Sequence, residues 1–172
     1  MPHSLTFLKN HIIFSTKYRV EWITSDKAPR LYAYIADVAK SKKAQVIEIG
    51  GIEDHVHVLA NFHASRPVSG VVGAIKANSS RFGKELLDNE DFGWQEGYAA
   101  FSVSESEVER VRRYIRNQRE HHARMTYEDE IRKICQRYRI EPSEAFIKGH
   151  PSEEPEETSP TIPIRSPEGG SG

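Results

Sequence analysis

The order of strand-like and helix-like segments constrains the fold of this chain more than any other feature. Four segments are rich in β-branched and aromatic residues, as strands are, and two carry apolar residues at helical spacing. The expected strands span residues 5–16, 44–49, 55–62 and 98–103, and the expected helices span residues 25–42 and 67–82. Along the chain they follow the order strand, helix, strand, strand, helix, strand.

That order is typical of the split βαβ, or ferredoxin-like, arrangement in the α+β class. We therefore predict an antiparallel sheet with helices on one face, its middle strands joined as a hairpin by Gly50, Gly51 and an acidic turn. Two additional C-terminal helices are expected. A long one begins at a capping box of Ser104 and Glu107 and is the candidate cover for the other face, and a second spans residues 126–138.

The last part of the chain differs from the rest in composition. Residues 151–172 hold five of the nine prolines together with five glutamates, too little apolar surface to offset the entropy of ordering. We expect one domain over residues 1–150 and a disordered, acidic, Pro-rich tail over residues 151–172. Without that tail, 23 lysines and arginines stand against 20 acidic residues, so the expected domain is mildly basic and compatible with a nucleic-acid partner.

Two absences in the sequence indicate the compartment. Cys135 is the single cysteine, which excludes an internal disulfide framework and fits a reducing environment. The sequence has neither an apolar run of about 18 residues, the length needed to cross a bilayer, nor a secretory leader. We therefore expect a cytoplasmic protein with no membrane partner.

The segment His55-Val56-His57 lies in the middle of an expected strand. Because side chains alternate along a strand, both imidazoles should point to one face and Val56 to the other. Two neutral imidazoles on one rigid strand can chelate a divalent ion. The alternative is a pair of solvated or hydrogen-bonded core histidines, since a bare His-x-His motif is common.

Tyr114 and Gln118 are four residues apart in the expected third helix and so share one face, with His121 three residues further on. This line runs beside the apolar stripe rather than within it. Tyr114 can therefore offer a hydroxyl nucleophile, and Gln118 a carbonyl oxygen as a third metal ligand. The alternative is ordinary: a packing tyrosine and a helix-forming glutamine.

Basic side chains are concentrated on the second and third expected helices, near aromatic residues. This mixture is typical of surfaces that contact phosphates and stack on unpaired bases, although interleaved glutamates also allow a merely solvated helix face. The candidate DNA-binding residues are Lys76, Arg81, Lys84, Arg110 and Arg113.

Several blocks of residues, taken together, resemble a known family. They are His11–Arg19, Glu53–His57, Lys76–Ser80, Gly97–Ser104 and Tyr114–His122. In this order they look like the signature blocks of the TnpA-type single-tyrosine transposases of small bacterial insertion sequences, the IS200-like transposases. These belong to the HUH (His-hydrophobic-His) endonucleases. The resemblance runs from about Leu5 to Tyr138.

The resemblance implies a ferredoxin-like homodimer that recognises hairpins in single-stranded DNA at the ends of a mobile element. His55, His57 and Gln118 would hold a divalent metal, Mg²⁺ or Mn²⁺. Tyr114 would attack the scissile phosphate and form a 5′-phosphotyrosine. The resemblance also suggests an active site shared between subunits, with the two histidines from one chain and Tyr114 and Gln118 from the other.

Three alternatives stay open at this point. A domesticated REP-associated tyrosine transposase would carry the same catalytic residues. A non-catalytic module that binds single-stranded nucleic acid would need neither the histidine pair nor Tyr114. A hydrolytic metalloenzyme would use His55 and His57 to activate water, although no acidic third ligand stands out beside them except Glu53 and Asp54.

Overall fold

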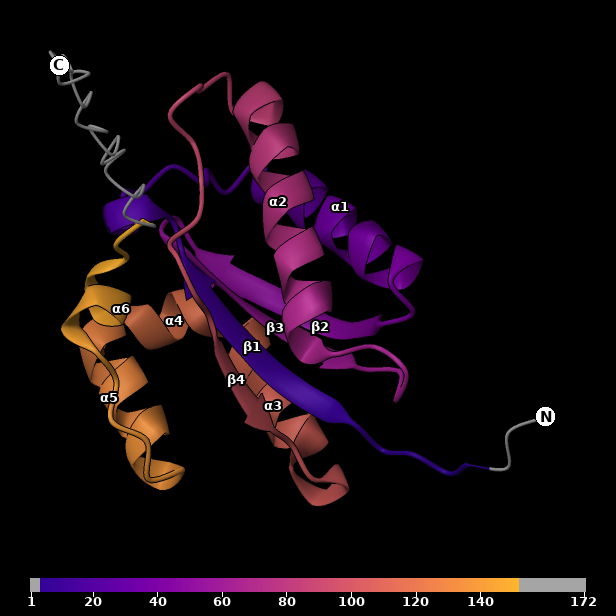
Figure 1. The fold of residues 1–172 in the computed structure, drawn as a ribbon. Coiled ribbons are helices and arrows are strands. Elements are labelled where there is room, and N and C mark those ends of the chain that lie inside the picture. The colour runs from indigo at the N-terminus through magenta and orange to yellow at the C-terminus, as the bar shows by residue number, and fades with distance from the viewer. Residues whose placement is uncertain (1–3, 152–172) are drawn as a thin grey trace, which may run out of the picture.

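A four-stranded antiparallel sheet lies at the centre of the molecule, which a computed structural model describes over residues 4–151 (Figure 1). The strands are β1 (Lys9–Ser15), β2 (Gln45–Ile52), β3 (His55–Asn61) and β4 (Ala99–Ser102). Their order across the sheet is β2-β3-β1-β4, so β3, which carries His55 and His57, pairs with β1 at the centre of the sheet. The predicted α+β, ferredoxin-like fold is confirmed.

Two long helices, α1 (Ala28–Ser41) and α2 (Val68–Leu86), cover one face of the sheet. Every second residue of the central strands points into the core beneath them, as the burial of Phe14, Val56 and Val58 shows. The helices meet this surface with apolar residues at helical spacing, among them Leu31 on α1 and Ile75 on α2. This face is a continuous apolar core.

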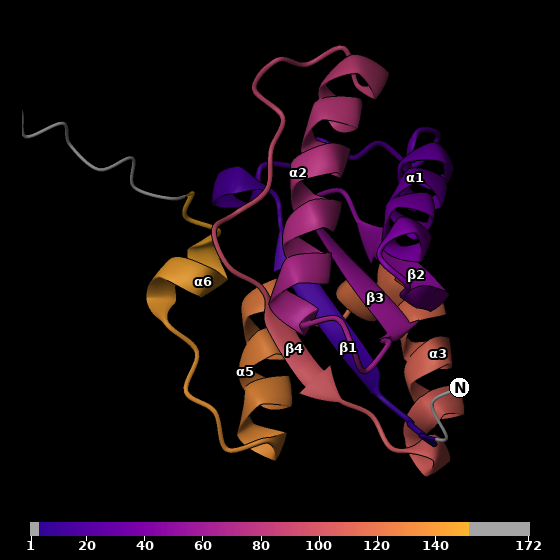
Figure 2. The same ribbon diagram turned by 45° about the vertical axis from the view of Figure 1, so that its right-hand side comes forward.

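The other face is covered by helices from the last third of the described chain (Figure 2). They are α3 (Val108–Arg116), α4 (Gln118–His122), α5 (Tyr127–Arg137) and α6 (Glu144–Lys148). Ile115 of α3 packs on Leu59, and Ile131 of α5 packs with Ile13 and Phe101. The predicted cover by the third helix is therefore correct but incomplete, because α5 covers the rest.

The long third helix predicted from Ser104 does not form as one element. Residues Glu105–Glu107 make a separate 3₁₀ turn (η2), and the Ser104 hydroxyl lies 3.2 Å from the Ser106 hydroxyl instead of capping a backbone N–H. The helix also stops at Asn117, whose backbone leaves the helical region with φ −98° and ψ 22°. The chain restarts as α4, and this break turns the side chain of Gln118 into the protein interior.

The predicted hairpin forms, and its turn is acidic as expected, made by Glu53 and Asp54. The prediction that Gly50 and Gly51 take part in the turn is wrong, because both lie inside β2, paired with β3. A Cβ atom at Gly50 would lie 2.4 Å from the carbonyl oxygen of Ile115. The glycine is therefore required because the backbone of α3 approaches the sheet closely there, opposite His57 in the strand register.

The remaining expectations differ from the structure in smaller ways. The first strand begins at Lys9, since Leu5 and the residues up to Leu8 are exposed and β3, its partner, ends at Asn61. A short 3₁₀ turn, η1 (Lys17–Arg19), and the helix α6 were not predicted. The expected tail lies outside the described residues except for Pro151. Within residues 4–151, no helix is long and apolar enough to cross a membrane.

Candidate active site

The His55 and His57 side chains lie on the face of the sheet covered by α3, α4 and α5, while Val56 points to the opposite core. The alternation predicted from the sequence is therefore correct. Both imidazoles are fully buried. They are not solvated histidines, and each has a defined partner for one ring nitrogen.

Each of these partners contacts the ring nitrogen Nδ1 of its histidine. His55 Nδ1 lies 2.7 Å from Oδ1 of Asp54, which only accepts, so this nitrogen donates. His57 Nδ1 lies 2.8 Å from Nε2 of His11 on the neighbouring strand. Burial lowers the pKa of His11 well below its ordinary value, which keeps that ring neutral, and its Nε2 accepts in the tautomer in which His57 Nδ1 carries the proton. In that tautomer the Nε2 lone pairs of both His55 and His57 face the inner side.

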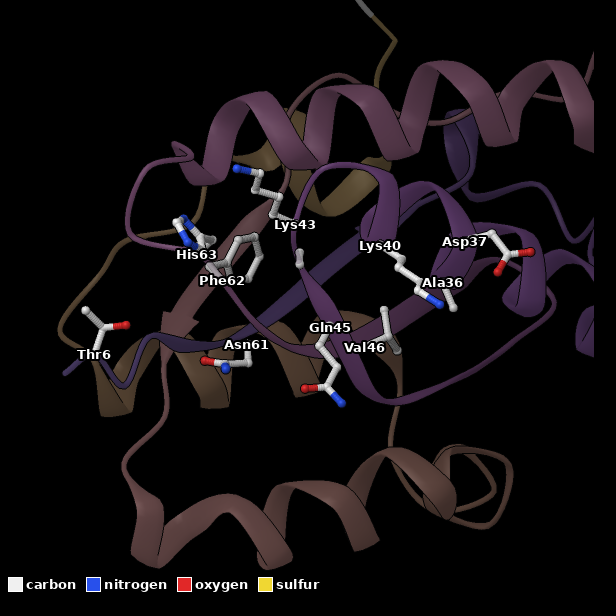
Figure 3. A pocket seen from close by; sticks show the side chains of 11 residues that line it. Thr6, Ala36, Asp37, Lys40, Lys43, Gln45, Val46, Asn61, Phe62 and His63 are labelled. Carbon is white, nitrogen blue, oxygen red and sulfur yellow. The ribbon is translucent and has the colours of Figure 1, made fainter. Parts of the chain in front are cut away.

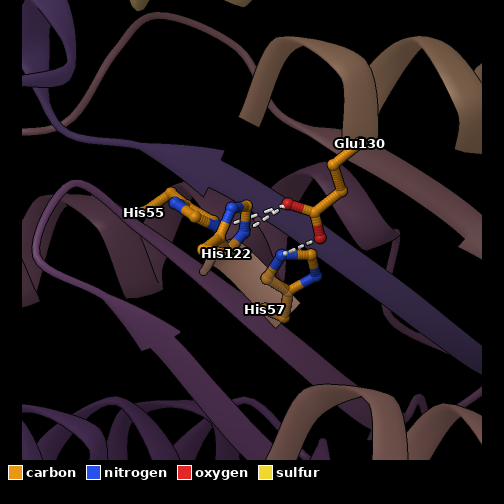
Figure 4. Close-up of side chains that lie close together, drawn as sticks. All are labelled: His55, His57, His122 and Glu130. Atoms are coloured by element: carbon orange, nitrogen blue, oxygen red, sulfur yellow. Dashed lines mark ion pairs between the residues drawn. The ribbon is translucent and has the colours of Figure 1, made fainter. Parts of the chain in front are cut away.

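A third histidine and a carboxylate complete the cluster (Figure 4). His122 of α4 directs Nδ1 to the Met125 carbonyl oxygen at 3.0 Å, which leaves its Nε2 facing inward as well. One ligand atom from each of His55, His57, His122 and Glu130 lies within 4.8 Å of the others. The four side chains therefore converge from β3, α4 and α5 on one small volume.

Glu130 lies between the three imidazoles. Its Oε1 is 3.0 Å from His57 Nε2, and its Oε2 is 2.6 Å from His122 Nε2 and 3.6 Å from His55 Nε2. Gln118 is buried beside it, donates from Nε2 to Glu130 Oε1 at 3.1 Å, and places its own Oε1 3.1 Å from His55 Nε2.

This donor set fits a divalent cation. His57 Nε2 and Glu130 Oε2 are buried without a hydrogen-bond partner of suitable geometry, which is unusual for native polar groups. Where His55 donates through Nδ1, its Nε2 lone pair faces the Gln118 oxygen, and two acceptors at that distance need a cation between or beside them. Imidazole nitrogens with carboxylate and amide oxygens are ligands that Mn²⁺ accepts, and Mg²⁺ accepts the oxygens in particular.

The electrostatics of the cluster keep Glu130 ionised. Burial alone would raise the pKa of its carboxyl group, but the neighbouring His57, His122 and His55 outweigh burial and hold that pKa far below the ordinary value. Burial lowers the pKa of His57, whereas Glu130 outweighs burial at His122 and raises the pKa of that imidazole. A neutral His57 beside a carboxylate is the protonation state that metal binding requires.

Tyr114 of α3 lies beside this cluster and contacts it through Glu130. Its hydroxyl donates to Glu130 Oε1 and lies 3.2 Å from Nε2 of His121. Burial, followed by the charge of Glu130, raises the pKa of Tyr114, so the phenol is protonated here. The single chain thus brings Tyr114 and Gln118 next to its own histidine pair. The expectation that these residues come from different subunits stays a prediction.

A hollow of about 330 Å³ opens beside Tyr114 and is lined by Glu130, Arg110, Lys133 and Arg137, among others. Arg113 lines an adjoining depression that Tyr114 also borders. Two of the candidate DNA-binding residues, Arg110 and Arg113, therefore lie next to the tyrosine.

The other three candidate DNA-binding residues, Lys76, Arg81 and Lys84, lie on α2, which covers the opposite face of the sheet. The structure does not bring them together with Tyr114. Lys76 is partly buried and donates to the Gly97 carbonyl oxygen at 2.6 Å, and Arg81 donates to Asn78 at 2.8 Å.

A separate hollow of about 600 Å³ lies on the α1 side of the sheet, between the end of that helix and the ends of β2 and β3 (Figure 3). Its polar lining includes Lys40, Lys43 and His63. It holds no tyrosine and only one histidine, so the chemistry described above has no counterpart there.

The sequence analysis did not identify Glu130 and His122, which belong to the cluster, or His11, which contacts His57 from outside it. Glu130 had a recognisable signal, because it falls on the apolar stripe of its helix, three residues after Tyr127 and next to Ile131. His11 interrupts an apolar strand on the side of Ile13, which was a weaker signal.

The family model described as "Transposase IS200 like" matches residues 4–118. The ISDra2 transposase TnpA of Deinococcus radiodurans is 27% identical over 117 residues, which covers 64% of this chain and 84% of that protein. The transposase for insertion sequence element IS200 of Salmonella typhimurium is 27% identical over 127 residues, covering 70% of this chain and 82% of the relative.

Solved structures show the same fold. A candidate transposase from Deinococcus radiodurans R1 superposes with a TM-score of 0.56 at 23% identity, over 69% of this chain and 95% of the other. A REP-associated tyrosine transposase bound to a REP hairpin superposes with a TM-score of 0.54 at 11% identity, over 74% and 77%. Because the family model covers most of the domain that carries the cluster, this chain belongs to the family of IS200-like transposases.

Proposed function

We propose that this protein is a metal-dependent transposase that cleaves and rejoins single-stranded DNA through a 5′-phosphotyrosine on Tyr114. The observation that supports this most directly is the hydrogen bond between the Tyr114 hydroxyl and Glu130, the carboxylate that lies among three inward-facing imidazoles. A protein that only binds nucleic acid has no need of a buried nucleophile joined to such a cluster.

Tyr114 is the proposed nucleophile. Its oxygen attacks the scissile phosphorus, the bond to the 3′-oxygen breaks, and the chain is left attached to the 5′-phosphate of the downstream strand. Attack by a 3′-hydroxyl on this phosphotyrosine reverses the step and rejoins strands without an external energy source. The phenol gives up its proton as the new bond forms, and His121 and Glu130 lie within reach of that proton.

The metal ligands are proposed to be His55, His57 and Gln118, as the resemblance implies. A bound Mg²⁺ or Mn²⁺ would act as a Lewis acid on a phosphoryl oxygen. The chain itself orients both imidazoles, through Asp54 and His11. Arg110 and Arg113 lie close enough to Tyr114 to hold the phosphates that flank the scissile one.

The proposed substrate is a hairpin in single-stranded DNA at an element end, and the proposed assembly is a homodimer. The structure of a REP-associated tyrosine transposase bound to a REP hairpin has a similar fold, which is compatible with this substrate class. It also keeps a domesticated enzyme acting on dispersed genomic hairpins as a second candidate. Imperfect palindromes immediately flanking the gene would favour a mobile element, and their absence would favour the domesticated enzyme.

Incubation of labelled single-stranded hairpin DNA with Mn²⁺, followed by a denaturing gel, tests the chemistry. The wild type should form a covalent adduct, and Tyr114→Phe should form none while binding DNA about as well. Tyr34→Phe is a matched control, because Tyr34 stacks on Phe82 on the opposite face of the sheet. An adduct that survives in Tyr114→Phe would reject the nucleophile. Cut DNA without any adduct would favour the hydrolytic metalloenzyme.

Mixing two inactive chains tests the shared site. A Tyr114→Phe chain and a His55→Ala/His57→Ala chain are each inactive alone, and a heterodimer recovers activity only if the site combines residues of both subunits. The shared-site prediction expects cleavage to return, because the intact histidines of one chain then meet the intact Tyr114 of the other. No recovery in confirmed heterodimers would reject the shared site and favour a site made by one chain, which itself places Tyr114 beside its own histidine cluster.

A further inference from the structure

We propose that Glu130 links the metal site to the nucleophile, with one carboxylate oxygen serving as a metal ligand and the other positioning the Tyr114 hydroxyl. The proposal rests on the proposed function, because it assumes that a metal binds the histidine pair and that Tyr114 reacts. It adds a residue and a helix, α5, to the active centre.

The two oxygens of Glu130 have different surroundings. Oε1 accepts from the Tyr114 hydroxyl and from Gln118 Nε2 at 3.1 Å, and it also lies 3.0 Å from His57 Nε2. Oε2 faces His122 Nε2 at 2.6 Å and His55 Nε2 at 3.6 Å, and it has no hydrogen bond of suitable geometry. Oε1 is therefore the oxygen that contacts the nucleophile, and Oε2 faces the imidazoles of His55 and His122.

A purely structural role does not explain this carboxylate. Glu130 is 1% exposed and has no lysine or arginine partner among the described residues; its ionisable neighbours on the basic side are the three histidines of the cluster. A buried charge of this kind stabilises a fold less well than an apolar side chain of similar size. The helix is held in place without it, because Tyr127, Ile131 and Cys135 pack against Ile13 and Phe101.

Glu130 lies outside the part of the chain that the family model matches. The family model ends at residue 118, whereas Glu130 lies twelve residues later. Thr126 caps α5 by accepting from the Asp129 N–H, and the apolar stripe of the helix then directs Glu130 toward β3. The segment after the matched region is therefore expected to be required for metal binding and for cleavage.

Titration calorimetry of the full chain with Mn²⁺ measures the ligand role directly. Glu130→Gln keeps the size of the side chain and loses the charge, so its Mn²⁺ affinity should fall about tenfold or more. Glu128→Gln makes the same change on the exposed side of the same helix, where Glu128 pairs with Arg132, and should bind like the wild type. His57→Gln serves as the positive control.

Adduct formation at saturating Mn²⁺ measures the positioning role. Once the site is filled, a defect in metal affinity no longer limits the reaction, so a rate for Glu130→Gln that stays about tenfold low indicates a misplaced Tyr114 hydroxyl. Glu130→Asp keeps the charge on a shorter arm. The Glu130→Asp variant should bind Mn²⁺ more tightly than Glu130→Gln. It should still react slowly, because the shorter side chain cannot contact both the metal and the Tyr114 hydroxyl.

The outcomes separate the two proposals. Wild-type Mn²⁺ affinity in Glu130→Gln, with weakened binding in His57→Gln, would reject the ligand role of Glu130 and leave the proposed function intact. A wild-type rate for Glu130→Gln at saturating Mn²⁺ would reject the positioning role. Unchanged affinity in both variants would reject the metal site itself. If Glu130→Gln does not fold, Glu130→Asp decides by the same two measurements.

Discussion

The two faces of the sheet are built from the same strands and bury different kinds of side chain. On β3, Val56 and Val58 enter an apolar core under α1 and α2, while His55 and His57 enter a polar cluster under α3, α4 and α5. All four side chains are buried to the same degree. Burial therefore does not distinguish the two faces, and the kind of partner does.

This difference predicts which variants change stability and which change metal binding and cleavage. An apolar side chain buried on the α1–α2 face contributes about 1.5–3 kcal/mol by leaving water. On the other face, ionised Glu130 and three imidazoles are desolvated, and their contacts with one another and with neighbouring polar groups such as Asp54 and Gln118 offset that cost. We expect variants of the first face to change stability, and variants of the second to change metal binding and cleavage.

Leu31→Ala should have the largest effect. Leu31 is fully buried in the apolar core, and its truncation should lower the free energy of unfolding by about 2–5 kcal/mol. Urea denaturation measures this loss. The Mn²⁺ affinity of the folded protein should not change, and a weakened affinity would show that the two faces are coupled rather than separate.

His57→Gln should have the opposite profile. The glutamine keeps a polar side chain beside Glu130 and leaves no large cavity, so we expect the free energy of unfolding to change much less than in Leu31→Ala. The Mn²⁺ affinity should fall about 10- to 100-fold, because a ligand nitrogen is lost. Calorimetry and urea denaturation on the same samples test this. A large loss of stability with unchanged affinity would mean that the histidines are structural.

Local patterns predicted the fold and the first members of the site. The alternation of side chains along one strand placed His55 and His57 on one face, as the structure has them. The four-residue spacing of Tyr114 and Gln118 assumed one continuous helix. The two residues lie on separate helices, α3 and α4, and both donate to Glu130.

The members that were missed depend on contacts between distant elements. Glu130 reaches the cluster only because α5 packs on β1. The sequence of this helix by itself does not indicate which surface of the protein the helix covers. Asn117 is not a strong helix breaker, so the break between α3 and α4 could not be seen in the sequence. Gly50 reads as a turn residue until α3 is known to lie against it.

Lys76 offers a weaker test of whether DNA contacts the α2 side as well. Burial lowers the pKa of Lys76 to about 8. If it contacts a phosphate, Lys76→Gln should reduce the salt dependence of DNA binding by about 0.7 in log–log slope at pH 7, and by little at pH 9.5, where the wild-type amine is neutral. An identical slope at pH 7 would show that Lys76 does not contact a phosphate.

The lowered pKa of Lys76 also predicts how the stability of the protein changes with pH. Above about pH 8 the folded protein releases the Lys76 proton, while the unfolded chain keeps it until near the ordinary value of 10.5. The unfolded state then binds more protons, so wild-type stability should rise with pH across this window relative to Lys76→Gln. Urea denaturation at pH 7 and pH 9.5 measures the difference between the two proteins.

The smallest effect is expected from Arg119→Ala. Arg119 of α4 pairs with Glu53 at 2.8 Å, but its side chain is 63% exposed, so water competes with the pair and the loss should be at most about 0.5 kcal/mol. This pair joins α4 to the β2–β3 turn, directly before Asp54 and His55. If Ile115 and the buried cluster hold the helices on the sheet, both urea denaturation and Mn²⁺ calorimetry should be nearly unchanged. A loss of more than about 2 kcal/mol, beyond what an exposed pair contributes, would mean that surface charge anchors the functional face. The two faces would then differ in how their helices are held on the sheet as well as in the side chains that they bury.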